Sequence, residues 1–282
     1  MNISADQVVY SGKPSPLLER IKRFGTKGLD FNKITISDMC QGEGTSSFHM
    51  FAKLGAIGEL PEAWLTPKYI VEFQDSDGNA PIHVAAEWGK LNSVPSKLKN
   101  QITLSTLGKN EYTVFHYAAY ASHLDSIPKP LITKENMLLK SKLGKTPLHG
   151  AAGGGQLDLV PSDLRTSEYL FLRDSFRETP FHLAAEYGHL DQIPIKLLTL
   201  QNLTARGFMR NSLGHAMNAN QLAQIPIFKP EQVCLMSQEE RNNWQVALND
   251  VAIELKSNNA AAVLEVLSRD WSHLATHEWG SL

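Results

Sequence analysis

The chain has 282 residues, of which 42% are hydrophobic, and its 27 basic and 29 acidic side chains give a formal net charge of −2. This composition supplies enough apolar side chains for a buried core, and the balanced charge argues against nucleic acid or an anionic membrane as a partner. No apolar run approaches the ~20 residues of a membrane span, and the first residues do not resemble a secretory signal. Cys40 and Cys234 stand far apart, so we expect a reducing compartment and no disulfide framework.

Residues 1–43 are expected to form a loose arm followed by a degenerate capping repeat. Ser15 is suited to be an N-cap, and Pro16 follows at the first helical position, where a missing N–H group costs nothing. The pattern predicts a helix that ends near Gly25 and a second layer over residues 34–39. A terminal repeat must present a polar face to water, which accounts for the loss of the motif described next.

Residues 44–226 contain six copies of one motif. Its most regular residue is a histidine, which recurs after 34 residues once and after 33 residues four times. A fixed period of this length is typical of repeat proteins, whose copies stack on one another. The repeat histidines are His49, His83, His116, His149, His182 and His215.

The copy Thr146-Pro147-Leu148-His149 shows the physical role of each position. Thr146 is suited to be an N-cap, Pro147 to be the first helical residue, and the His149 imidazole can reach back to the cap. An Ala-Ala pair then allows neighbouring helices to approach closely, and a glycine six positions after the histidine supplies the left-handed residue that ends the helix. We therefore expect a short helix, followed by a leucine and an Ile or Val that point inward.

The combination of Thr-Pro-Leu-His, Ala-Ala and Gly-x-Leu on a 33-residue period resembles the ankyrin repeat. The resemblance implies an all-α solenoid of about six helix-turn-helix repeats with β-turn tips, and it extends to bacterial ankyrin proteins, including effectors delivered into host cells. One departure concerns the second helix of each repeat, which we expect to be broken into two brief pieces. The residues suited to cap the extra piece are Thr66, Thr133, Thr166 and Thr199.

The tips between repeats are polar and contain turn residues, as in Asp75-Ser76-Asp77-Gly78, so β-turns are expected there. The tip around Asn110-Glu111 lacks the glycine and should depart from the others.

Residues 227–282 are expected to form a helical cap and a tail. Ser237 and Glu240 have the spacing of a capping box, and apolar residues at helical spacing follow from Trp244 to Leu255. Ser257 or Asn258 is suited to cap a second helix that carries Ala262, Val263, Val266 and Leu267.

Nothing in the sequence points to catalysis. The repeat histidines occupy capping positions about one repeat apart, so we assign them to hydrogen bonding and not to metal. His273 and His277 have the i, i+4 spacing of a helical metal pair, but the sequence fixes no third ligand. We therefore expect no enzymatic activity, no cofactor and no metal, and an enzyme with unrecognised C-terminal chemistry is the less favoured alternative.

The resemblance to ankyrin repeats places the concave face at positions four, five and seven after the histidine, here called slots four, five and seven. Rigid aromatic side chains in these slots suit a binding surface, although Trp88 and Tyr187 could equally cover the helix ends of neighbouring repeats. Glu87 and Glu186 beside them favour a partner with basic residues. The candidate partner-binding residues are Glu87, Trp88, Lys90, Tyr120, His123, Gln156, Glu186, Tyr187 and His189.

These observations predict a monomeric protein-binding module that acts through the concave face of an ankyrin solenoid. A peptide or small-molecule binder at the same groove is the alternative, as is a bacterial effector that acts on a host protein. A cytoplasmic location is expected, or export into a host cell without an N-terminal signal peptide.

Overall fold

The computed structural model describes residues 15–40, 44–205, 225–255 and 260–269. Within these ranges every regular element is helical and no strand occurs, which confirms the all-α class. The chain forms two compact units, residues 1–150 and 151–282, and each is described by itself. His215, Ser257, Asn258 and the tail with His273 and His277 lie outside the described residues.

The first unit begins with α1 (Pro16–Phe24) and α2 (Ile36–Cys40). The Ser15 hydroxyl accepts a hydrogen bond from the Leu18 amide, and the helix ends at left-handed Gly25, as the sequence predicts. The thiol of Cys40 is buried, and this burial raises its pKa to about 11. The thiol therefore stays protonated near neutral pH, as expected of a structural cysteine.

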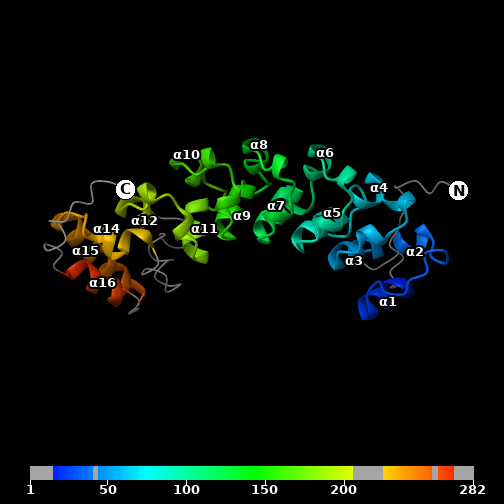
Figure 1. Cartoon of the computed structure of the whole chain (residues 1–282), viewed down its shortest axis with the longest axis horizontal. Coiled ribbons are helices and arrows are strands. Elements are labelled where there is room, and N and C mark those ends of the chain that lie inside the picture. Colours follow the sequence, from blue (N-terminus) through cyan, green and yellow to red (C-terminus); the bar gives the residue numbers. More distant parts are fainter. Residues whose placement is uncertain (1–14, 41–43, 206–224, 256–259, 270–282) are drawn as a thin grey trace. The chain divides into compact units, whose positions relative to one another are not determined.

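The histidine-containing segment of each described copy forms a short helix. In the first unit α3, α5 and α7 lie side by side (Figure 1). The Ala-Ala pairs on α5 and α7 are fully buried, as are the inward leucines that follow these two helices. The five helices are α3 (Ser47–Leu54), α5 (Pro81–Glu87), α7 (Val114–Tyr120), α9 (Pro147–Gly153), which contains the boundary between the units, and α11 (Pro180–Tyr187).

The remainder of each copy forms brief helical pieces, which confirms that the second helix is broken. Two 3₁₀ turns come first, at residues 57–59 and 62–64 in the first copy, and a four-residue α-helix follows. A proline stands just before the second turn and outside it, as Pro61 does at ψ 138°. The short helices are α4 (Pro67–Ile70), α6 (Gln101–Leu104), α8 (Lys134–Met137), α10 (Ser167–Leu170) and α12 (Leu200–Thr204).

All four threonines predicted to cap these short helices are at the N-cap, but only Thr133 and Thr199 accept a hydrogen bond there. In these two copies the third helical residue is asparagine, and its amide donates back to the preceding 3₁₀ turn, from Asn136 to the Leu131 carbonyl at 2.7 Å. The same bond joins Asn202 to the Leu197 carbonyl at 2.8 Å. The break is thus held by a side-chain bond across it.

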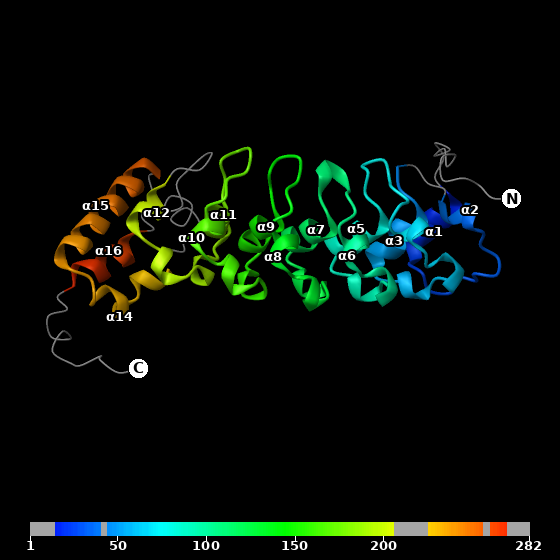
Figure 2. The ribbon, with the colours of Figure 1, turned by 90° about the horizontal axis from the view of Figure 1, so that it is seen from above.

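The tips share one hydrogen-bond pattern and project from the same side of the first unit (Figure 2). The Asp75 amide donates to the Asn79 carbonyl at 2.8 Å, and the Gly78 amide donates back to the Asp75 carbonyl at 3.0 Å. The tip around Asn110-Glu111 keeps these bonds but places both Asn110 and Glu111 at positive φ, 57° and 61°. The predicted departure is therefore a second left-handed residue.

Two glycines of α9 differ in what surrounds them. A Cβ on Gly150 would lie 2.8 Å from the backbone nitrogen of Tyr120 and 3.0 Å from the carbonyl carbon of Ala119. A Cβ on Gly153 would meet only Tyr187 Cδ2 at 3.4 Å and Leu183 Cβ at 3.5 Å, which is ordinary van der Waals contact. Only Gly150 is therefore required by close packing.

Gly150→Ala is expected to lower the free energy of unfolding by ~1–3 kcal/mol, because rigid backbone must move away from the new methyl group. Gly153→Ala is expected to be neutral or to stabilise by up to ~1 kcal/mol, since alanine favours the helix. Urea unfolding of the two variants checks this pair. Equal effects would show that the spacing around α9 is incorrect.

The C-terminal helices of the second unit are α14 (Pro230–Val233), α15 (Gln238–Leu255) and α16 (Ala261–Ser268), preceded by a 3₁₀ turn at residues 226–228. The predicted capping box is present, with the Ser237 amide donating to Glu240 at 2.7 Å and the Glu240 amide donating to the Ser237 hydroxyl at 3.1 Å. Trp244 is buried and packs edge-on against Phe228 at 5.0 Å between ring centroids. Over the described ranges, no helix combines the length and the apolar character needed to cross a membrane.

Candidate binding surface

Four repeat histidines, His49, His83, His116 and His182, each join their own N-cap to a backbone carbonyl further along the chain. In the third copy His116 Nδ1 accepts from the Thr113 amide at 3.1 Å, and Nε2 lies 3.1 Å from the Lys145 carbonyl oxygen. An acceptor at Nδ1 requires the proton on Nε2, so the imidazole is neutral and donates to the carbonyl. Nε2 likewise lies within hydrogen-bond distance of the Asn79, Thr106 and Ala205 carbonyls in the copies of His49, His83 and His182.

Burial sets the protonation of these rings. Removal from water lowers the pKa of His49 and of His83, and the bonds to the Asn79 and Thr106 carbonyls only partly oppose this. Burial lowers the pKa of His116 to about 4. The rings of His49, His83 and His116 are therefore neutral, and both nitrogens of each ring are paired within the framework that holds the surface residues.

In the first unit the exposed aromatic of slot five is Trp88, which ends α5 and is 47% exposed. The Lys53 ammonium, from slot four of the preceding copy, lies 4.0 Å from the centroid of the Trp88 ring. The indole is thus supported by the neighbouring copy and still presents surface to solvent. Glu87 beside it is exposed.

The slot-seven residues lie against the glycine of the preceding copy. An added Cβ on Gly55 would lie 3.0 Å from Lys90 Cδ, and one on Gly89 would lie 2.7 Å from His123 Nδ1. His123 is half-buried by this contact, whereas Lys90 is exposed. Lys90 therefore presents its ammonium group at the surface.

Tyr120 is half-buried and has a packing role. Its ring stacks on Tyr112 at 5.7 Å between centroids, and the Lys145 ammonium lies 5.7 Å from the ring. The same ring lies against Gly150, within 2.8 Å of where a Cβ would be. Tyr120 therefore contributes an edge of the surface rather than a free aromatic face.

In the second unit Tyr187 is the exposed aromatic, with 60% of its surface in solvent. Its ring rests on Gly153, so slot five again lies on slot four of the preceding copy. His189 packs on Gly155 as His123 does on Gly89, and Glu186 is exposed. Gln156 is half-buried and precedes the 3₁₀ turn at residues 157–159.

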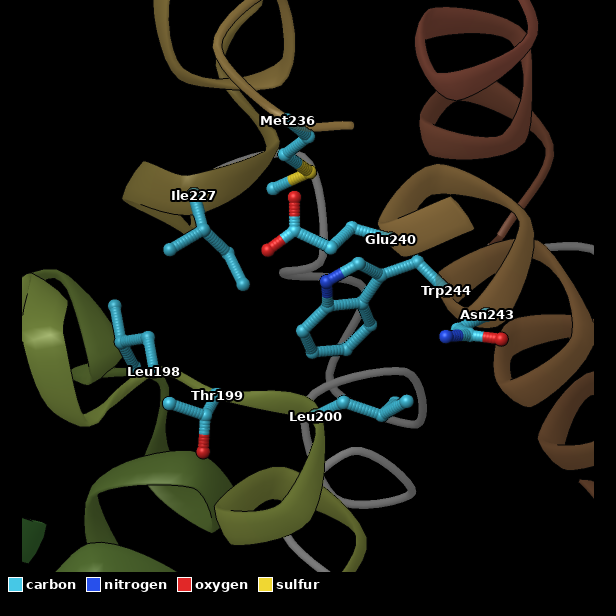
Figure 3. A pocket seen from close by; sticks show the side chains of 8 residues that line it. All are labelled: Leu198, Thr199, Leu200, Ile227, Met236, Glu240, Asn243 and Trp244. Atoms are coloured by element: carbon cyan, nitrogen blue, oxygen red, sulfur yellow. The ribbon is translucent and has the colours of Figure 1, made fainter. Parts of the chain in front are cut away.

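The second unit also contains a pocket of about 260 Å³ that the sequence did not predict. Figure 3 shows Trp244 and Glu240 on one side, facing Ile227 and Leu198 across the opening. The walls are mainly apolar, with the Glu240 carboxylate at the rim. The lining residues are Leu198, Thr199, Leu200, Ile227, Met236, Glu240, Asn243 and Trp244.

Two contacts on these surfaces were missed from the sequence. Lys53, the slot-four residue of the first copy, lies against Trp88 but was not among the candidate binding residues. Gln192 links two copies of the second unit, accepting from the Leu157 amide at 2.9 Å and donating to the Gly155 carbonyl at 2.6 Å. Both pair residues about 35 positions apart, and a motif within one copy carries no sign of them.

Within the described residues no cluster of three or more His, Cys, Asp or Glu side chains is arranged to hold a metal ion. The surfaces instead offer exposed aromatic rings, ammonium groups and carboxylates on short, regularly spaced helices. In comparisons with known proteins, no protein-family model matches this chain and no curated protein sequence matches it.

Proposed function

We propose that the chain is an ankyrin-repeat protein that binds another protein through its slot-four, slot-five and slot-seven residues. The period and motif of the sequence support the family, and the succession of a short helix, 3₁₀ turns and a polar tip is consistent with it. No charge excess favours nucleic acid as the partner.

One observation carries the binding proposal. Trp88 and Tyr187 occupy the same slot in two copies, are 47% and 60% exposed, and each rests on the preceding copy. A large ring that is already held in place offers contact area at a low cost in conformational entropy, which is why aromatic residues dominate binding hot spots. Covering a helix end and anchoring a partner are thus compatible roles for one ring.

Trp88→Ala or Tyr187→Ala is expected to weaken partner binding by ~1–4 kcal/mol if that ring is an anchor. The partner is first captured on immobilised protein and identified, and its affinity for each variant is then measured by calorimetry. Ile102→Ala is the matched control, because Ile102 is 84% exposed on α6, away from these slots. If both aromatic variants keep their affinity and Ile102→Ala loses it, binding belongs to the short helices such as α6 and not to these slots.

A second candidate function is the binding of a small apolar ligand in the pocket between α12 and α15. Its apolar walls and its single carboxylate suit a compact amphipathic molecule, although about 260 Å³ is below the usual range of ligand pockets. Trp244 fluorescence during titration with ligands of this kind tests it.

A further inference from the structure

The C-terminal ends of α3 and α5 form one exposed cluster, here called the α3–α5 ridge, made of Lys53, Leu54, Trp88 and Lys90. The Lys53 ammonium lies 4.0 Å from the Trp88 ring centroid, and Lys90 lies along Gly55, the residue after Leu54. Leu54 is 44% exposed and Trp88 is 47% exposed. Two apolar surfaces and two ammonium groups therefore share one site in the first unit.

The apolar part of the ridge follows the repeat. Leu54 and Trp88 each stand directly before a left-handed glycine, and α1 also ends in an exposed apolar residue before a left-handed glycine, Phe24. Single exposed apolar residues are normal on a protein surface. Their recurrence at the ends of α1, α3 and α5, where α3 packs against both α1 and α5, instead suits the apolar side of an amphipathic partner segment.

The charged part of the ridge is positive. Lys53 and Lys90 form no ion pair with any residue of the described ranges, and the same holds for Glu87 beside them. The unpaired charged groups here are therefore two ammonium groups and one carboxylate, which leaves a net positive charge. Since Lys53 is already held at the indole face, its ammonium can bind a carboxylate at a small further cost in side-chain entropy.

We infer that the α3–α5 ridge binds an acidic amphipathic segment of the partner protein. An apolar side chain of the segment packs on Leu54 and Trp88, and a neighbouring carboxylate binds the ammonium groups of Lys53 and Lys90. This inference rests on the proposed protein-binding function and names the class of partner. It reverses, for the first unit, the basic partner expected from Glu87, because that expectation considered one copy at a time and left out Lys53 of the preceding copy, which lies against the indole.

The test is selection from a random 16-residue peptide library displayed on phage, with the full chain immobilised. Enriched peptides are expected to carry Asp or Glu within about four residues of Leu, Ile, Phe or Met, the spacing that shares one face of a helix. A synthetic copy of the most enriched peptide should bind about tenfold or more weakly to the Lys53→Gln/Lys90→Gln double variant and to Trp88→Ala. Ile102→Ala should bind it as the unsubstituted chain does.

Thermal melting checks that each variant is folded, and the lysine double variant keeps the test valid should Trp88→Ala unfold. Selection of Lys- or Arg-rich peptides, an absence of enrichment, or equal binding by the double variant would each overturn the inference. Tight binding of a single-stranded oligonucleotide at the ridge would overturn it as well. If Trp88→Ala weakens binding of the captured partner but no acidic peptides are enriched, the proposed function stands and only the acidic class of partner is rejected.

Discussion

Acidification from about pH 7 to about pH 5 is expected to lower the unfolding free energy of the first unit by about 2 kcal/mol through His116 alone. Burial holds the pKa of this imidazole at about 4 in the folded chain, against 6.5 for the free side chain. Between about pH 6.5 and pH 4 the unfolded chain therefore binds a proton at His116 and the folded chain does not. The contribution is complete above pH 6.5 and is lost as the pH falls toward about 4. His49 and His83, whose pKa values are also lowered, act in the same direction.

The measurement is the urea midpoint as a function of pH, followed by circular dichroism. His116→Asn should be less stable at neutral pH but should show a smaller loss of stability between about pH 6.5 and pH 5, since one titrating ring is absent. A midpoint that is flat over this range would mean that the rings are solvated in solution.

His83→Ala is expected to destabilise the first unit by about 2–4 kcal/mol, the largest effect of any repeat histidine. The ring accepts from the Ala80 amide at 2.9 Å and lies 2.8 Å from the Thr106 carbonyl, and its removal leaves both groups buried without these bonds. In this copy the N-cap is Ala80, which has no hydroxyl that could accept from the amide of residue 83 and cap the helix in the absence of the ring.

His149→Ala in the same unit is the matched control. There the Thr146 hydroxyl lies 3.4 Å from the amide nitrogen of residue 149 and can still accept from it. We expect the control to lose less stability than His83→Ala, by ~1 kcal/mol, the usual effect of an N-cap. Equal losses in the two urea unfolding curves would show that the cap contributes nothing in this repeat.

The features that recur along the described copies could largely be predicted from the sequence. The histidine bonds, the buried Ala-Ala pairs and the broken second layer follow from local chemistry at a fixed position, and six copies serve as their own comparison. The pairing of Lys53 with Trp88 and of Tyr120 with Gly150 could not be predicted, because each depends on which side chains two particular copies bring together. The exposed aromatic rings of slot five could accordingly be placed from the sequence, whereas the Lys53 ammonium against Trp88 could not.

The histidine bonds set the order in which the repeats can complete their structure during synthesis. His49 lies against the carbonyl of Asn79, and His116 lies against that of Lys145, so each ring depends on residues about 30 positions later. A ribosome must add that stretch before the older repeat can close its last bond. Each of these repeats therefore completes its bonds only after the next repeat has been synthesised. In a nascent chain halted between His116 and Lys145, the His116 imidazole would lack its carbonyl acceptor.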